Sequence, residues 1–223
     1  NKTVFYAQGI GPLNHRFSRF LLSWIGKRTD LITVRDNDSL KLLSEIGLEG
    51  DWVKETVDPV YGLASSEIEN RVKSNKIKEF IEAEKIDSDE TIIGISVRPW
   101  GSNQYLSAVA RAADYLADKL ADKIIIIPMY LANDFEVCQK LEQKMERPAL
   151  LFSRQLTPPE ILSFYNYFDF FMGVRLHSLI FAAVNHIPLL GISYDPKVDS
   201  LLKDLELETG LSTENCHFGR LKK

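Results

Sequence analysis

Four side chains with the chemistry of an anion site follow apolar runs in the second half of this chain. They are Arg98, Arg175, His177 and Lys197. An arginine can hold a carboxylate or phosphate through two parallel hydrogen bonds, and a lysine adds a compact positive charge. A histidine titrates near neutral pH and can carry a proton. Together these residue types indicate a site for a small polyanion with an acid/base group beside it.

The stretch from Arg175 to Ser178 also opens a predicted helix, whose first N–H groups and positive dipole end attract anions. Ser178 and Tyr194 lie in the same stretches that follow the strands and join the predicted substrate-binding set. Taken alone, each arginine fits a surface salt bridge equally well, His177 fits a capping role, and Lys197 fits a solvated position. Their occurrence at several strand ends favours the functional interpretation.

The elements that must position these residues alternate regularly from residue 91 onward, as in a parallel, doubly wound sheet. Short apolar runs predict strands at Thr91–Val97, Lys123–Met129, Ala149–Ser153, Phe170–Val174 and Pro188–Ser193. Amphipathic stretches predict helices at Gln104–Leu120, Asp134–Met145, Pro158–Phe168, Leu176–Val184 and Pro196–Leu205. Asp195 precedes Pro196 as the expected N-cap of the last helix.

Ligands of such sheets bind beyond the carboxyl ends of the strands, where the strand order reverses. If these five strands take the common order 3-2-1-4-5, the first, fourth and fifth are neighbours. We therefore expect Arg98, Arg175, His177 and Lys197 to surround one cleft. Tyr130 and Arg154, which follow the second and third strands, are expected on the far side of the sheet.

The first sixty residues repeat the α/β pattern on a smaller scale, with strands at 4–9, 31–34 and 52–56 and helices at 16–25 and 39–46. Gly9 and Gly11 follow the first strand, where small residues let a ligand approach the backbone. The segment lacks the last glycine of the dinucleotide fingerprint, because Leu13 and Asn14 stand there. Arg16, on the next helix, joins the predicted substrate-binding residues, whereas Arg19 is expected to be solvated.

Composition divides the chain into residues 1–63, a linking helical segment at 64–90 that is dense in charged residues, and residues 91–223. The predicted fold class is α/β with two Rossmann-like lobes. Because the chain opens almost directly on a core strand, we expect the N-terminal lobe to be truncated.

Bulk properties exclude several classes of function. The 223 residues are 45% hydrophobic and carry a formal net charge of −4, so no overall positive field attracts nucleic acid or an anionic bilayer. Two cysteines without metal-ligand spacing argue against a disulfide or metal framework. No apolar run approaches a membrane span of about 20 residues. We expect a cytoplasmic protein without metal or nucleic acid, in at most peripheral contact with the inner face of the membrane.

Two stretches, Gly173–Ser178 and Ile192–Val198, resemble the C-terminal motif pair of the polysaccharide pyruvyl transferase family, which includes cell-wall pyruvylating enzymes. Ala7–Leu13 and Ser96–Arg98 are also similar to motifs of that family, so the resemblance covers most of the chain. It implies a GT-B-like fold and transfer of pyruvate from phosphoenolpyruvate to a sugar of a cell-surface polysaccharide or its lipid-linked precursor, as a ketal. It also implies no cofactor, with phosphoenolpyruvate as donor substrate.

By the same resemblance, Arg98 and Arg175 hold the carboxylate and phosphate of the donor, His177 is the acid/base, and Lys197 contacts the phosphate. One alternative is a GT-B glycosyltransferase or sugar-nucleotide epimerase, in which Asp195 or Asp199 would bind ribose hydroxyls. A second is a non-catalytic module that binds a polyanion without releasing phosphate.

Overall fold

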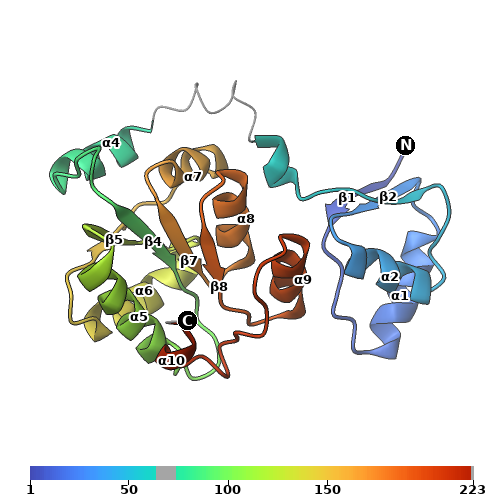
Figure 1. Cartoon of the computed structure of the whole chain (residues 1–223). Coiled ribbons are helices and arrows are strands. Elements are labelled where there is room, and N and C mark those ends of the chain that lie inside the picture. The colour runs from blue at the N-terminus through green and yellow to red at the C-terminus, as the bar shows by residue number, and fades with distance from the viewer. Residues whose placement is uncertain (64–73, 222–223) are drawn as a thin grey trace. The chain divides into compact units, whose positions relative to one another are not determined.

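The computed structural model describes residues 1–63 and 74–221, which form two compact units, Asn1–Gly62 and Leu63–Lys223 (Figure 1). Both units are α/β, as the sequence predicts. The linking segment expected at 64–90 falls partly outside the described residues, and its described part, from residue 74, belongs to the second unit. Each unit is described below by itself.

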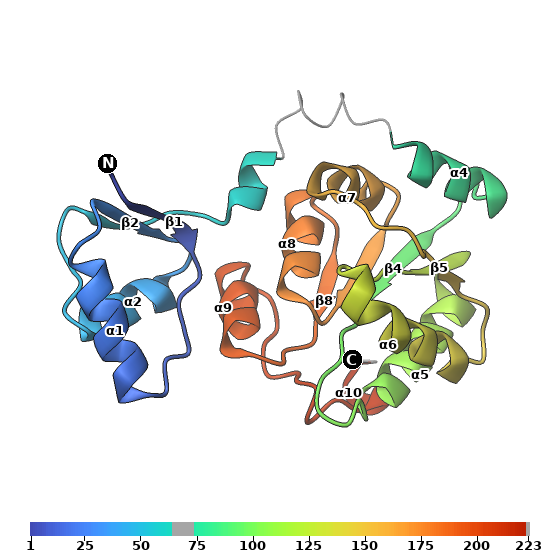
Figure 2. The same cartoon turned by 180° about the vertical axis from the view of Figure 1, so that it is seen from behind.

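The first unit is a three-stranded parallel sheet in the order β1-β2-β3. Its elements are β1 Val4–Gln8, α1 Arg16–Gly26, β2 Leu31–Val34, α2 Asn37–Glu45, β3 Val53–Glu55 and the 3-10 helix η1 Pro59–Leu63. Figures 1 and 2 show α1 and α2 on the same face of this sheet. A small core lies between them, centred on Ile32, Val34, Leu43, Leu48 and Val53.

The second unit is built on a five-stranded parallel sheet in the order β6-β5-β4-β7-β8. Its strands are β4 Ile92–Ser96, β5 Lys123–Ile126, β6 Leu150–Leu151, β7 Phe170–Gly173 and β8 Leu189–Gly191. In their order along the chain this is 3-2-1-4-5, so the predicted topology is confirmed. All five residues of β4 are buried, as expected for a strand in the middle of a sheet covered on both faces.

Helices cover both faces of this sheet, with α5 and α6 on one and α7 and α8 on the other (Figures 1 and 2). The helices of the unit are α4 Asn75–Ala83, α5 Leu106–Lys119, α6 Leu131–Lys144, α7 Pro158–Tyr165, α8 Leu176–Val184, α9 Pro196–Asp204 and α10 Phe218–Leu221. Helix α9 begins as predicted, since the Asp195 side chain accepts a hydrogen bond from the Lys197 N–H. Helix α6, in contrast, begins at Leu131, three residues before the predicted Asp134.

Polar contacts around Glu160 join α4 to α7. The Glu160 carboxylate accepts hydrogen bonds from the Thr157 N–H at 2.8 Å and from the Ser74 hydroxyl at 2.8 Å. The Thr157 hydroxyl lies 2.9 Å from the same carboxylate, and Lys76 Nζ is 3.5 Å away. The backbone hydrogen bond from Thr157 is the main cause that lowers the pKa of Glu160 from 4.5 to about 2.

Replacing Glu160 with glutamine is expected to lower the free energy of unfolding at pH 7 by about 1 kcal/mol. The folded-state pKa lies below the ordinary value of 4.5, so this stabilisation is present above pH 4.5 and is lost as the pH falls toward about 2. Urea denaturation of parent and variant between pH 2 and pH 7 measures it. A difference that stays constant over this range would contradict the assignment to the charged carboxylate.

No helix within residues 1–63 and 74–221 is long and apolar enough to cross a membrane.

Candidate functional site

Strands β4, β7 and β8 end side by side, and their register brings the loops that follow them to one edge of the sheet (Figure 1). Ser96 pairs with Gly173, and Gly173 pairs with Gly191. Arg98 and Arg175 each stand two residues beyond the paired residues Ser96 and Gly173. The strand order thus places the predicted loops at neighbouring positions. That the four side chains share one cleft stays a prediction.

The guanidinium group of Arg98 lies among aromatic rings. Its Cζ is 4.2 Å from the centroid of the Tyr194 ring and 5.2 Å from that of Trp100. The two rings contact each other at 4.9 Å between centroids. An aromatic face holds a cation by electrostatic attraction and leaves the N–H edges of the guanidinium available for hydrogen bonds.

Arg98 also carries an unsatisfied donor. Its Nε is buried and has no hydrogen-bond partner among the described residues, and the same is true of Ser96 Oγ at the end of β4. Leaving a buried donor without a partner costs about 1 to 3 kcal/mol, so native proteins keep few of them. A ligand that accepts a hydrogen bond from Nε would remove this cost.

The backbone around Arg98 is fixed by Tyr105. The Tyr105 hydroxyl donates a hydrogen bond to the Arg98 carbonyl oxygen at 2.5 Å. Burial raises the pKa of Tyr105 above its ordinary value of 10.0, so the hydroxyl keeps its proton. Asn103 Oδ1 accepts from the Trp100 N–H at 2.9 Å, which closes the same loop. The loop therefore presents Arg98 and Trp100 from a braced backbone.

Lys197 joins the same cluster through Tyr194. Its Nζ is 5.6 Å from the centroid of the Tyr194 ring and 3.6 Å from Asp195 Oδ2. The side chain of Lys197 is 38% exposed, so the ammonium group remains accessible to a ligand. The structure thus brings Arg98, Tyr194 and Lys197 together from the loop after β4, the loop after β8 and the first turn of α9. Trp100 is a fourth member that the sequence did not single out.

Arg175 makes a bidentate ion pair that the sequence did not predict. Its Nε donates to Asp134 Oδ2 at 2.6 Å and its Nη2 donates to Asp134 Oδ1. Asp134 is wholly buried in the first turn of α6 and also accepts a hydrogen bond from the Tyr130 N–H. Two of the nitrogens of Arg175 are therefore committed within the protein, which leaves Nη1 as the nitrogen without a partner among the described residues.

His177 and Ser178 lie in the first turn of α8, directly after Arg175. The His177 side chain is exposed, whereas Ser178 is wholly buried. The Ser178 hydroxyl donates to the Arg175 carbonyl oxygen at 2.6 Å. Ser178 thus fixes the turn that carries Arg175 and His177, and its hydroxyl points into the protein rather than toward solvent.

Gly9 and Gly11, the two predicted site glycines of the first unit, lie in different local environments. A Cβ atom on Gly9 would lie 2.6 Å from Nε of Arg35, whose Nη1 contacts Asp58 at 2.6 Å. Gly11 has a φ of +113°, a conformation that strongly favours glycine. Backbone geometry thus favours glycine at Gly11, Gly9 lies against the Arg35 guanidinium, and a contact of either with a ligand stays a prediction.

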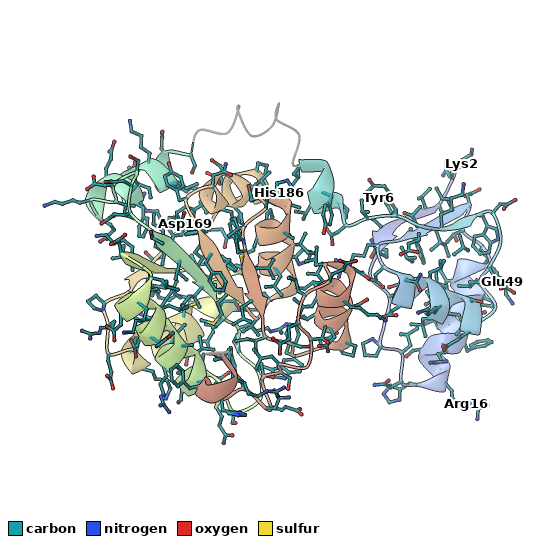
Figure 3. All side chains as sticks on the ribbon, viewed as in Figure 1. Lys2, Tyr6, Arg16, Glu49, Asp169 and His186 are labelled. Atoms are coloured by element: carbon teal, nitrogen blue, oxygen red, sulfur yellow. The ribbon has the colours of Figure 1, made fainter. Side chains whose placement is uncertain are left out.

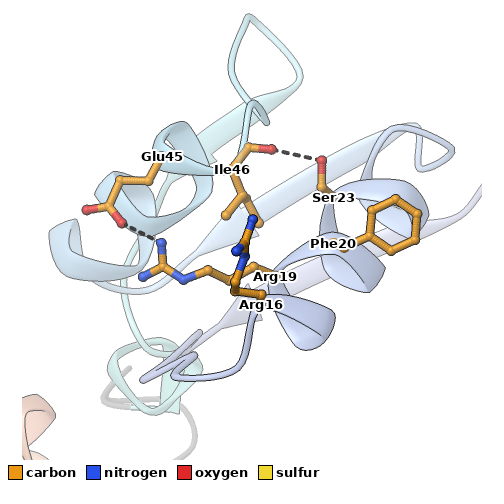
Figure 4. Close-up of a pocket in the computed structure, with 6 residues that line it drawn as sticks. All are labelled: Arg16, Arg19, Phe20, Ser23, Glu45 and Ile46. Carbon is orange, nitrogen blue, oxygen red and sulfur yellow. Dashed lines mark hydrogen bonds and ion pairs between the residues drawn. The ribbon is translucent and has the colours of Figure 1, made fainter.

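Arg16 and Arg19 border a surface hollow of about 310 Å³ at α1 (Figure 4). Arg19 Nη1 pairs with Glu45 at 3.2 Å, and Arg19 Nε donates to the Leu13 carbonyl oxygen. Arg16 is exposed and has no ion-pair partner among the residues that the structure describes.

A second hollow, of about 340 Å³, adjoins Trp100 in the second unit. Its lining combines the aromatic residues Trp100 and Tyr105 with amide, hydroxyl and carboxylate groups from Asn103, Gln104, Thr213 and Glu214. The Thr213 hydroxyl is buried and has no partner in the described part of the chain. These groups suit a ligand rich in hydroxyls, since each can exchange hydrogen bonds with it.

The two thiols do not have the character of nucleophiles. Burial raises the pKa of Cys138 to about 12 and that of Cys216, which lines the second hollow, to about 11. Both are therefore protonated at neutral pH. Within residues 1–63 and 74–221, no three His, Cys, Asp or Glu side chains gather as a metal site.

Comparison with solved structures shows which fold the chain shares with known proteins. UDP-GlcNAc 2-epimerase from Neisseria meningitidis bound to UDP-GlcNAc superimposes with a TM-score of 0.68 at 15% identity, over 95% of this chain and 56% of that one. MnaA from S. aureus with UDP gives 0.63 at 15% identity, over 93% and 56%. A glycosyltransferase from Rickettsia africae gives 0.53 at 13% identity, over 92% and 59%. The fold is GT-B-like, and the chain spans little more than half of these structures.

Comparison with protein families identifies the chain by sequence. No curated protein matches it significantly. The family model described as polysaccharide pyruvyl transferase matches residues 1–196, which include every predicted site residue except Lys197. By this match, which confirms the resemblance, the chain belongs to the polysaccharide pyruvyl transferase family.

Proposed function

We propose that this chain transfers pyruvate from phosphoenolpyruvate to two hydroxyls of one sugar, forming a ketal on a cell-surface polysaccharide or its lipid-linked precursor. The observation that carries the proposal is the environment of the Arg98 side chain. Its guanidinium group lies against the rings of Tyr194 and Trp100, its buried Nε has no partner among the described residues, and Lys197 Nζ lies 5.6 Å from the Tyr194 ring. This cluster suits a small ligand with a carboxylate and a phosphate.

The proposed reaction uses one proton donor and one base. The methylene carbon of phosphoenolpyruvate takes a proton, and one sugar hydroxyl attacks C2 and loses its own proton. The bond between C2 and the phosphate oxygen then breaks, inorganic phosphate leaves, and the second hydroxyl closes the ring with loss of a proton. His177 is the proposed acid/base, because it is exposed at the start of α8, next to Arg175.

The cations have separate proposed roles. Arg98 holds the donor carboxylate or phosphate, and Lys197 stabilises the charge of the departing phosphate. Arg175 contributes one N–H edge, since its other nitrogens contact Asp134. In this scheme the hollow beside Trp100 receives part of the acceptor, since hydroxyl, amide and carboxylate groups line it.

The alternative of a sugar-nucleotide enzyme receives less support from the site. Asp195 caps α9 through its own side chain, and Asp199 accepts a hydrogen bond from the Ser193 hydroxyl at 2.8 Å. Both carboxylates that would bind ribose hydroxyls are thus already engaged within the protein.

The test is phosphate release from phosphoenolpyruvate by the full chain across a panel of nitrophenyl and lipid-linked hexosamines. Calorimetric titration with phosphoenolpyruvate and with UDP-GlcNAc accompanies it. The proposal expects binding of phosphoenolpyruvate and acceptor-dependent phosphate release. Binding of the sugar nucleotide instead would favour the glycosyltransferase or epimerase. Phosphoenolpyruvate binding without phosphate release on any acceptor would favour the non-catalytic module.

Replacing Arg98 with lysine keeps the charge but removes the planar guanidinium and its Nε. We expect binding of phosphoenolpyruvate to weaken by about 1.5 to 3 kcal/mol, roughly 10- to 100-fold, as measured by calorimetry. Arg111 provides the matched control, because its Cζ lies 4.8 Å from the Phe218 ring at α5 and α10. Arg111→Lys should bind the donor like the parent, and equal binding by Arg98→Lys would remove Arg98 from the donor site.

A further inference from the structure

Helix α1 turns its apolar face away from the core of its own unit. Phe17, Phe20, Leu21 and Trp24 follow the spacing i, i+3, i+4, i+7 that places side chains on one side of a helix. These four side chains are 72%, 64%, 41% and 49% exposed. In a soluble domain such a stripe normally packs against the core, so its exposure requires an explanation.

The opposite face of α1 makes the contacts with the unit. Leu22 packs on the small core, and a Cβ atom on the buried Gly26 would collide with Leu48. Ser23 donates a hydrogen bond to the Ile46 carbonyl oxygen at 2.8 Å. Since Leu22, Ser23 and Gly26 hold this face of the helix against the unit, the outward direction of the aromatic residues is fixed by packing.

The charged residues of α1 and of its two ends are all positive. Residues 15–28 contain no aspartate or glutamate, and their basic residues are His15, Arg16, Arg19, Lys27 and Arg28. Glu45, from α2, is the acidic group that pairs with this set, through Arg19. Arg28 Cζ lies 4.0 Å from the centroid of the Trp24 ring, which places a cation directly on the apolar face.

The hollow beside α1 is lined by both charged and apolar side chains. Figure 4 shows Arg16 and Arg19 on one side of this hollow and Phe20 on the other. Figure 3 shows Arg16 projecting from the start of the helix, at the far end of the unit from Lys2. An exposed aromatic stripe with cations beside it is typical of helices that lie in the plane of a membrane interface.

We infer that α1 is a docking surface for an anionic lipid bilayer, with Phe17, Phe20 and Trp24 inserted at the level of the headgroups. Arg16, Lys27 and Arg28 contact the lipid phosphates. A bilayer fits better than a protein partner, because the exposed apolar stripe of α1 is flanked by positive groups at both ends of the helix, which matches the acyl chains and phosphates of a membrane interface. The whole chain has a net charge of −4, so this local positive surface is opposite in sign to the charge of the protein.

The test is sedimentation of the full 223-residue chain with vesicles, in the absence of any donor or acceptor substrate. We expect binding to vesicles of equal parts phosphatidylglycerol and phosphatidylcholine, and at least tenfold weaker binding to phosphatidylcholine alone or in 0.5 M salt. The double variant Phe17→Ser, Phe20→Ser should bind the anionic vesicles at least tenfold more weakly. Leu120→Ser is the matched control, because Leu120 is 65% exposed in the second unit.

Melting temperatures show whether each variant is folded, and the dependence on salt and lipid charge tests the parent protein even if the double variant fails to fold. Equal binding to both vesicle types, absence of binding, or unchanged binding by the double variant would overturn the inference. So would a parent protein that is dimeric by analytical ultracentrifugation and becomes monomeric in the double variant, because the face would then bind a second copy. These outcomes are independent of whether phosphoenolpyruvate is the donor.

Discussion

Replacing His177 with glutamine is expected to lower phosphate release at saturating donor by about 10² to 10⁴, with little change in donor affinity. Glutamine has a similar reach and forms hydrogen bonds, but it cannot shuttle a proton. His177 is exposed in the first turn of α8, directly after Arg175, so its replacement should leave the core unchanged. Phosphate release, calorimetry and the melting temperature are measured on one preparation.

His186 provides the matched control for this substitution. It is exposed just beyond the C-terminal end of the same helix, and Figure 3 shows it with Asp169 at the amino edge of the sheet, away from the loops described above. His186→Gln should keep parent turnover. If His177→Gln instead raised the donor dissociation constant or lowered the melting temperature while turnover at saturation survived, His177 would be an anion contact or a helix cap.

The fold could be predicted from the sequence because apolar strands and helix starts are each marked by short local patterns, which recur along the chain. The strand from Ile92 to Ser96 is apolar up to its last residue, and the α9 start is fixed by Asp195 and Pro196. Each of these depends on a few neighbouring residues, so spacing alone is sufficient to recognise it. The strand order then followed from the usual topology of such sheets, and with it the neighbouring positions of Arg98 and Arg175.

The partners of the site residues could not be predicted in the same way. Asp134 lies 41 residues from Arg175 along the chain, and its burial depends on how α6 packs beside the sheet. The sequence offered one signal, a carboxylate near the start of a helix after a buried strand, but solvated first-turn carboxylates look the same. The place of Trp100 beside Arg98 and Tyr194 likewise depends on the conformation of two loops.

The orientation of α1 could not be predicted from the sequence for a different reason. Periodicity locates the apolar face of a helix, and the usual inference is that this face meets the core. Here the residues that fit against Leu48 and Ile46 are Gly26 and Ser23, so the apolar face points outward. Which face of α1 is buried depends on how its side chains fit against the rest of the unit. The spacing of apolar residues does not contain that information.

Replacing Asp134 with asparagine is expected to lower the free energy of unfolding by about 3 kcal/mol. The change is nearly isosteric, so the packing of α6 is kept while the charge opposite Arg175 is lost. Arg175 is only 22% exposed, and a guanidinium in that position without a counter-charge is costly. Urea denaturation at pH 7 measures the change. The variant should also weaken phosphoenolpyruvate binding, because Arg175 is no longer fixed by two hydrogen bonds.

The ion pair between Arg154 and Glu79 gives a control of the same chemistry at the surface. Its side chains are 42% and 62% exposed, and pairs of this kind contribute about 0 to 1 kcal/mol. Glu79→Gln should therefore change stability little and leave donor binding at the parent value. If Asp134→Asn were as mild as Glu79→Gln, burial would not make the Arg175 pair important to the fold. If Asp134→Asn destabilised the protein but bound the donor normally at low temperature, Asp134 would support the second unit without positioning Arg175 for a ligand.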